Sequence, residues 1–120
     1  MKGVYTQRRA KRQDGRNKTE ALFESDVLKP RLAAKEIVDY WFEPFSINLD
    51  GCFYRPDFLV QKADGELVVY EIKALHRDMT PILTQEAKNK LNLLVNRYPF
   101  RVMVAAWNDY AGWHYFDVTG

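Results

Sequence analysis

The clearest pattern in the chain is a pair of apolar runs, Phe53 to Val60 and Leu67 to Leu75, with a polar segment between them that contains Asp64 and Gly65. Both runs are rich in β-branched and aromatic residues. An Asp-Gly pair between two such runs is typical of a β-hairpin. The sequence therefore predicts two antiparallel strands joined by a tight turn.

The register of this hairpin decides where its charged residues lie. A three-residue loop that ends at Gly65, with this glycine in the left-handed region, sets Asp57 opposite Glu71. Cross-strand partners share one sheet face with Cβ atoms about 5 Å apart, and Lys73 points the same way as Glu71. A two-residue loop would pair Asp57 with Ile72 instead and separate the charges.

Alternation along the two strands predicts one face that packs on a core and one that carries charge. The core face holds Tyr54, Pro56, Phe58, Val60, Val68, Tyr70 and Ile72. The opposite face holds Phe53, Arg55, Asp57, Leu59, Leu67, Val69, Glu71 and Lys73. Burying unpaired charges is costly, so we expect the charged end of this face to open into a cleft where a cation or a substrate compensates them.

The sequence pattern before the hairpin predicts an arm, a helix and a strand. Residues 1–17 lack apolar periodicity and form the arm; the remainder, residues 18–120, is the folded domain. A helix begins near Thr19, and Pro30 should break or kink it. The run from Ile37 to Ile47 predicts a strand, with a proline inside it that suggests an edge or a bulge.

After the hairpin, the pattern predicts one long helix and two strands. The helix should begin with Thr80 as its cap and Pro81 at its first position, and it should end near Tyr98. The strands are expected at Phe100 to Trp107, parallel to a hairpin strand because a helix connects them, and at Trp113 to Val118. The order αβββαββ predicts a mixed β-sheet flanked by helices, α/β or α+β in class.

Length and composition indicate one soluble globular domain. At 120 residues with 47% hydrophobic residues the chain can build a single core and has no room for a second. No apolar run approaches a membrane span of about 20 residues, and the start lacks a signal-peptide pattern. The single cysteine, Cys52, excludes an internal disulfide. We therefore expect a cytoplasmic protein of a bacterium or a phage-infected cell, with no membrane partner.

The net charge of +2 hides an asymmetry. Residues 1–18 contain seven basic residues and one acidic residue, which leaves 11 basic and 15 acidic residues for the rest of the chain. Basic arms often follow phosphate backbones through counterion release. From charge alone, a solvated terminus explains the arm equally well.

Two carboxylates beside a lysine are the residue types that a metal-dependent phosphodiesterase requires. Asp57 and Glu71 could hold Mg²⁺ through hard oxygen ligands, and the carbonyl of Ile72 could supply another. Lys73 could position a water molecule and stabilise the transition state. An ion-pair cluster on a solvated sheet face is the structural alternative for the same three side chains.

A third acid often completes such a metal shell. Glu20 lies in the first turn of the predicted N-terminal helix, which can lie across the sheet, and Glu24 lies one turn further on. Glu20 is the first candidate and Glu24 the second. Both could equally be surface acids favoured by the helix dipole.

Together, Pro56-Asp57, then Glu71-Ile72-Lys73, with a glutamate-bearing helix before them, resemble the PD-(D/E)XK nuclease superfamily. The resemblance spans residues 17–118. Within it, the stretch from Lys18 to Ala74 is similar to the nuclease domain of TnsA transposition endonucleases and to small phage-encoded nucleases, including Holliday-junction resolvase-like ones. The resemblance implies a restriction-endonuclease-like fold and hydrolysis of DNA phosphodiesters with Mg²⁺, for which Mn²⁺ can substitute. It places the metal-binding acids at Asp57 and Glu71, the catalytic lysine at Lys73 and the helix glutamate at Glu20.

The expected partner is DNA, which would be cut in a branched structure, at a transposon end or in phage DNA. The chain could act as a homodimer or together with a recombination or transposition protein. The expected DNA-binding residues are basic or amide side chains of the arm, the hairpin and the second helix: Arg8, Arg9, Lys11, Arg12, Arg16, Lys18, Arg55, Gln85 and Lys88. A non-catalytic nucleic-acid-binding or scaffold subunit that keeps the fold is the alternative.

Overall fold

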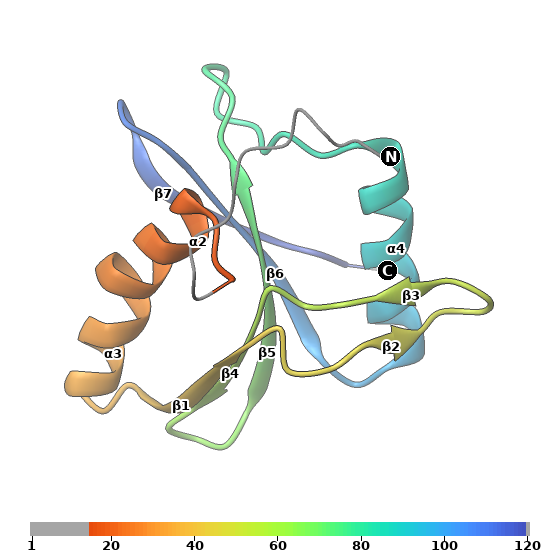
Figure 1. The fold of residues 1–120 in the computed structure, drawn as a ribbon, viewed down its shortest axis with the longest axis horizontal. Coiled ribbons are helices and arrows are strands. Elements are labelled where there is room, and N and C mark those ends of the chain that lie inside the picture. Colours follow the sequence, from red (N-terminus) through yellow and green to blue (C-terminus); the bar gives the residue numbers. More distant parts are fainter. Residues whose placement is uncertain (1–14, 120) are drawn as a thin grey trace.

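In the computed structural model, which describes residues 15–119, a five-stranded mixed sheet separates two helical layers (Figure 1). The strand order is β1-β4-β5-β6-β7, and only β5 and β6 run parallel. The strands are β1 (Ile37–Phe42), β4 (Phe58–Lys62), β5 (Leu67–Ala74), β6 (Arg101–Asn108) and β7 (Gly112–Asp117). The protein is therefore mixed α+β, and the predicted order αβββαββ of the main sheet and its helices is confirmed.

The N-terminal helical layer is one continuous run made of α2 (Lys18–Phe23), a π-helical turn η1 (Glu24–Leu28) and α3 (Lys29–Ala33). The prediction that Pro30 breaks the helix is wrong, because the helical run continues and Pro30 is the second residue of α3. The predicted kink stays a prediction, although the regular α-helical pattern is interrupted directly before this residue. Immediately before it, the Lys29 N–H donates to the Glu24 carbonyl across a wider turn. Such a π-turn accommodates a proline within the helical run, because proline cannot donate a backbone hydrogen bond.

The hairpin β4–β5 has the predicted three-residue loop. The Lys62 N–H donates to the Glu66 carbonyl at 2.8 Å, and Gly65 has φ +92°, a conformation that favours glycine. Pairing then continues as far as Phe58 opposite Tyr70. This is the register in which the next rung brings Asp57 to the level of Glu71.

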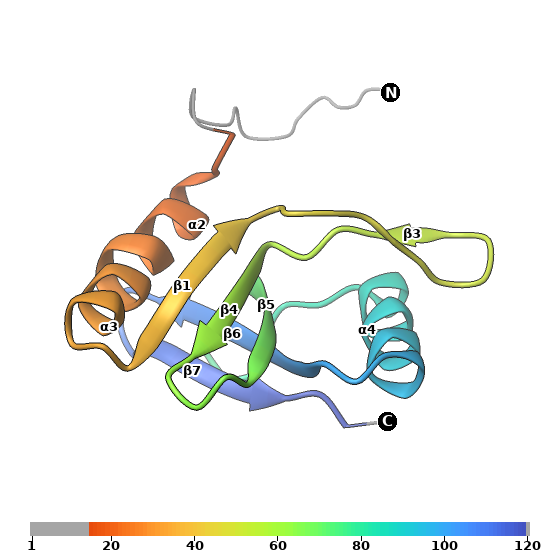
Figure 2. The same cartoon turned by 90° about the horizontal axis from the view of Figure 1, so that it is seen from below.

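A second, two-stranded sheet interrupts the chain between β1 and β4. We call the hairpin of β2 (Ile47–Asn48) and β3 (Phe53–Tyr54) the wing; it lies beside α4 (Gln85–Arg97) (Figure 2). The predicted single strand from Ile37 to Ile47 is thus divided, since β1 ends at Phe42. The strand from Phe53 to Val60 is divided as well, because Arg55-Pro56-Asp57 lies between β3 and β4. Tyr54 consequently packs on the α4 side and not with Phe58 as alternation predicted.

The helix α4 begins four residues later than the sequence predicted. Thr80 does not cap it, because its N–H and hydroxyl both donate to the Asp78 carboxylate, and Pro81 forms an isolated bridge with Leu75. Thr84 is the cap, and its hydroxyl accepts a hydrogen bond from the Ala87 N–H at 3.0 Å. The predicted end is confirmed, with Arg97 as the last helical residue before Pro99.

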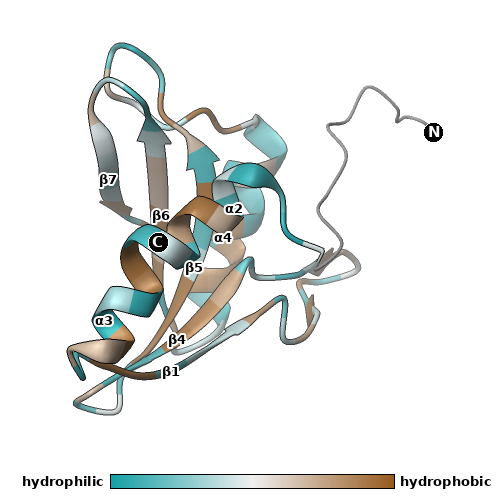
Figure 3. Cartoon of the chain, turned by 60° about the vertical axis from the view of Figure 1, so that its left-hand side comes forward, coloured by the Kyte–Doolittle hydropathy of each residue, from teal (hydrophilic) through white to brown (hydrophobic). Residues whose placement is uncertain are grey.

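The sheet has a hydrophobic core on each face. The N-terminal helices supply Phe23, Val27 and Leu28 to one core, and α4 supplies Leu91 and Leu94 to the other. In Figure 3 α2 and α3 cross in front of strands that are mostly hydrophobic. Both faces of the central strands β4 and β5 are therefore occupied, and polar chemistry is confined to their ends. Within residues 15–119 no helix is long and apolar enough to cross a membrane.

Candidate active site

The carboxylate of Asp57 lies at the start of β4 and reaches across to β5. Its Oδ2 accepts a hydrogen bond from the Ile72 N–H at 2.7 Å. Ile72 was predicted to contribute its carbonyl oxygen, whereas the contact that the structure shows uses its N–H; the carbonyl as a ligand stays a prediction. The hydrogen bond fixes Asp57 at the end of the hairpin, one rung beyond the Phe58–Tyr70 pair.

Glu71 lies on β5, and two side chains hold its carboxylate. The Tyr54 hydroxyl, from the wing, donates to Oε1 at 2.6 Å, and Lys73 Nζ lies 3.4 Å from Oε2. Glu71 is only 9% exposed, while about a third of the Lys73 side chain is accessible. The predicted neighbourhood of Glu71 and Lys73 is thus present, and Tyr54 is an addition that the sequence did not reveal.

The N-terminal helix brings Glu20 to the same place. Glu20 is 4% exposed and forms a capping box with Asn17, in which Glu20 Oε1 accepts the Asn17 N–H at 2.9 Å. Glu24 is occupied elsewhere: its carboxylate accepts the Tyr40 hydroxyl and pairs with Arg16, both at 2.5 Å. Of the two acids that the sequence offered, it is therefore Glu20 that joins Asp57.

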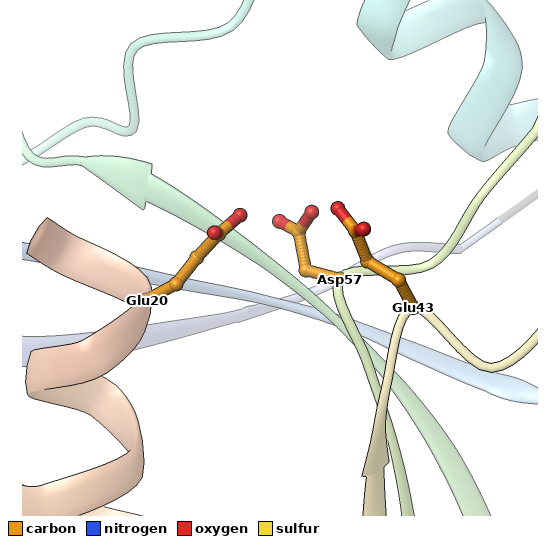
Figure 4. Close-up of side chains that lie close together, drawn as sticks. All are labelled: Glu20, Glu43 and Asp57. Atoms are coloured by element: carbon orange, nitrogen blue, oxygen red, sulfur yellow. The ribbon is translucent and has the colours of Figure 1, made fainter. Parts of the chain in front are cut away.

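A third acid, Glu43, completes a triad that the sequence analysis missed. One carboxylate oxygen from each of Glu20, Glu43 and Asp57 lies within 4.8 Å of those of the other two. Figure 4 shows the three carboxylates converging from α2, from the residue after β1 and from the start of β4. The β1–β4 register of the structure brings Glu43 there: Phe42 pairs with Phe58, so Glu43, which follows β1, lies opposite Asp57, which precedes β4. Indeed, the Glu43 N–H donates to the Asp57 carbonyl at 2.9 Å.

The acids repel one another electrostatically. Burial raises the pKa of Asp57 well above its ordinary value of 3.8, and the negative charges of Glu71 and Glu20 raise it further. Burial also raises the pKa of Glu71, although the hydrogen bond from Tyr54 and the charge of Lys73 oppose the rise. Within residues 15–119, Lys73 lies 3.4 Å from Glu71 and the Arg55 guanidinium lies 3.9 Å from Glu43, so the four carboxylates of the cluster outnumber these two cations.

This donor set fits a hard divalent cation. Mg²⁺ is bound in proteins through carboxylate oxygens and keeps several waters, and the triad of Glu20, Glu43 and Asp57 offers one oxygen from each acid around a shared point. A dication there would also relieve the repulsion that raises the pKa of Asp57. Glu71 is outside this triad, next to Lys73, and can join it as a further ligand or serve as the partner of the lysine.

The predicted DNA-binding residues are dispersed. Arg8, Arg9, Lys11 and Arg12 lie outside the described residues. Arg16 packs inward, with its guanidinium 4.3 Å from the centre of the Phe42 ring, and Lys18 is exposed at the start of α2. Gln85 hydrogen-bonds Asn89 on the surface of α4.

Arg55 and Lys88 lie in different clefts. Arg55 lines a cleft of about 310 Å³ that also contains Glu71, whereas Lys88 lines a separate one of about 290 Å³ on the other side of α4, towards Phe116. Lys90, which the sequence analysis did not select, lines the cleft of Glu71. The helix thus presents a lysine to the site two residues later than predicted.

No protein-family model, curated protein or solved structure matches the chain. What the site can do is therefore inferred from its own residues.

Proposed function

We propose that this protein is a metal-dependent DNA endonuclease of the PD-(D/E)XK type that hydrolyses phosphodiester bonds with Mg²⁺. The observation that supports this best is the convergence of Asp57, Glu71 and Lys73 at one end of the β4–β5 hairpin, with Glu20 brought in by α2. Binding alone does not require several acids beside one lysine, whereas metal-dependent phosphodiester hydrolysis uses such acids to hold its metal.

Each side chain has a role in this proposal. Glu20, Glu43 and Asp57 hold the metal, which when bound neutralises charge on the phosphate and lowers the pKa of water. Lys73 is one third accessible, so its ammonium can approach the scissile phosphate and stabilise the charge that develops there. Glu71 keeps the ammonium in place from 3.4 Å, and the Tyr54 hydroxyl orients Glu71.

The direct test is Mg²⁺-dependent cleavage of branched, nicked and linear DNA by the wild type and by Lys73→Ala. We expect the wild type to cut at least one of these substrates and Lys73→Ala to lose at least about 100-fold in rate, because it lacks the charge beside the phosphate. Lys29→Ala is the matched control, since Lys29 is an exposed lysine of α3, outside the cluster and not among the expected DNA-binding residues. DNA binding by the wild type without cleavage of any substrate would favour the non-catalytic subunit.

The metal site is tested separately by calorimetry with Mn²⁺. Glu20→Gln and Glu43→Gln should each weaken Mn²⁺ binding by about 10-fold or more, because each removes one anionic ligand. Glu36→Gln is the control, because Glu36 is an exposed carboxylate at the opposite end of the sheet, beside Lys62. Equal affinities in all four proteins would contradict the proposed ligands.

A further inference from the structure

The cleft beside Glu71 lies between the wing and α4. Its walls include Tyr54 and Arg55 on one side and Ala87, Lys90 and Leu91 on the other. Glu71, whose carboxylate is part of the acidic cluster, also faces it. The cleft is therefore continuous with the candidate active site.

Three polar contacts fasten the wing to α4 and keep the cleft in shape. Lys90 Nζ donates to the Phe53 carbonyl at 3.3 Å, and the Tyr98 hydroxyl donates to the Asn48 carbonyl at 3.0 Å. Arg97 forms a two-pronged pair with Asp50 at the tip of the wing. Because these contacts are spread along the wing, the separation of the two walls is set by the fold.

The cleft carries two cations that its acids do not neutralise fully. The Arg55 side chain is 60% exposed, and its guanidinium is 3.9 Å from Glu43, a loose contact. Lys90 contacts Glu86 at 3.7 Å, but Glu86 is 79% exposed and can turn to solvent. Both cations can therefore approach a phosphate that enters beside Glu71.

Resting on the nuclease function proposed above, we propose that this cleft binds a single, unpaired DNA strand that leads to the scissile phosphate, with Arg55 and Lys90 contacting its backbone. The volume of the cleft, about 310 Å³, is at the small end of ligand pockets. This volume is enough for roughly one nucleotide of a single strand and is too small to take a base pair of a duplex. The substrate class is thus DNA with an unpaired strand at the cut, as in a flap, a fork or a junction.

The test compares two lysines of the same helix. Binding of a fluorescein-labelled single-stranded oligonucleotide to the full chain is measured with Ca²⁺ in place of Mg²⁺, at several salt concentrations. Lys90→Gln should weaken binding by about fivefold at 0.1 M salt and reduce the slope of log K against log salt by about 0.7, the value for one lost phosphate contact on a single strand. Lys88→Gln should leave both values unchanged, because Lys88 lines the other cleft.

Two more comparisons keep the test decisive. Lys90→Gln also removes the hydrogen bond to the Phe53 carbonyl, whereas Arg55→Gln leaves the three contacts between the wing and α4 in place. Arg55→Gln should nevertheless weaken single-strand binding by a similar factor, because it removes a charge that contacts the strand. The matching blunt duplex should bind all variants alike. Equal losses for Lys88→Gln and Lys90→Gln, or an equal loss on the duplex, would overturn the proposal.

The outcome is separable from that of the nuclease proposal. A wild type that cleaves DNA while Lys90→Gln behaves like Lys88→Gln refutes the strand-binding cleft alone. A wild type that never cleaves, but whose single-strand binding depends on Lys90 and Arg55, supports the cleft and refutes the nuclease.

Discussion

The two ends of the β4–β5 hairpin handle charge in opposite ways. At the end with the loop, which we call the turn end, opposite charges are paired on the surface: Lys62 with Glu66 at 3.0 Å and Arg101 with Asp117 at 3.1 Å. At the other end, the site end, four buried or half-buried acids lie close together, with Lys73 beside Glu71 and Arg55 3.9 Å from Glu43: Glu20, Glu43, Asp57 and Glu71.

This difference separates structural charges from functional ones. Exposed ion pairs contribute little to stability, but they leave no group unsatisfied. Buried like charges are unfavourable for the free protein, and burial with mutual repulsion raises the pKa values of Asp57 and Glu71. The site end is therefore the part of the sheet whose charges need a further partner, and the turn end is not.

The variant with the largest expected effect is Asp57→Asn, which tests whether the charges of the site end differ from those of the turn end. This change should abolish Mn²⁺ binding and reduce any Mg²⁺-dependent cleavage by at least about 100-fold, because it removes a ligand of the proposed site. At neutral pH it should also stabilise the metal-free protein, since the neutral amide removes repulsion and can still accept from the Ile72 N–H. Thermal unfolding with a chelator measures the stability.

A destabilised Asp57→Asn protein would contradict the comparison, because it would mean that the Asp57 charge is compensated within the fold. Asp109→Asn serves as the control, since Asp109 is an exposed acid of the β6–β7 turn.

The stability of the metal-free protein should decrease as pH increases, because the pKa values of its buried acids are raised. The pKa values of Asp57 and Glu71 in the folded protein lie above their ordinary values of 3.8 and 4.5. The stabilisation that comes from protonating these groups is therefore complete below the ordinary pKa values, and it is lost as pH rises through the raised pKa values of the folded protein. The metal-free protein should therefore melt at lower temperature as pH increases above about 4.5, while Mn²⁺ affinity increases. In the double variant Asp57→Asn, Glu71→Gln, the melting temperature should lose most of this dependence, and an unchanged profile would contradict the assignment.

The hairpin and its charged rung could be predicted from the sequence because local chemistry sets the register. The sequence allows a two-residue or a three-residue loop, and the three-residue loop that ends at Gly65 is the one in which Asp57 and Glu71 share a level. The helix before Pro99 and the parallel strand β6 followed from equally local signals, a proline stop and a continuous apolar run.

What could not be predicted depends on long-range contacts. Glu43 reaches Asp57 through the β1–β4 register, and no short turn joins those two strands, so the sequence offers nothing that fixes their alignment. Tyr54 points at Glu71 because Pro56 interrupts the strand, and simple alternation therefore assigned Tyr54 to the wrong face. Lys90, and not Lys88, lines the cleft of the site because of the way α4 packs against the wing, which is also a long-range contact.

A smaller effect is expected for Tyr54→Phe, which removes one hydroxyl from the site end. The loss of its hydrogen bond to Glu71 should weaken Mn²⁺ binding or cleavage by about 10-fold, as for other groups that orient a metal ligand, and should cost about 1 kcal/mol of stability. Tyr98→Phe is the matched control because its hydroxyl also joins the wing to α4 but contacts the Asn48 carbonyl. Equal kinetic losses in both variants would show that the wing acts only as a structural support.

The smallest effect is expected at the turn end, from Asp117→Asn. The hydrogen bonds from Arg101 lower the pKa of Asp117 below its ordinary value of 3.8, so its charge stabilises the fold above that value and the contribution is lost as pH falls through the lowered pKa. The variant should therefore melt slightly below the wild type at pH 7, by less than about 2 °C, and the difference should vanish in acid. Cleavage should not change. The stability that depends on Asp117 thus changes with pH in the opposite sense to the stability that depends on Asp57. The reason is that a paired surface acid favours its charged form and a crowded buried acid does not. The same sign at both ends would contradict the distinction between structural and functional charges.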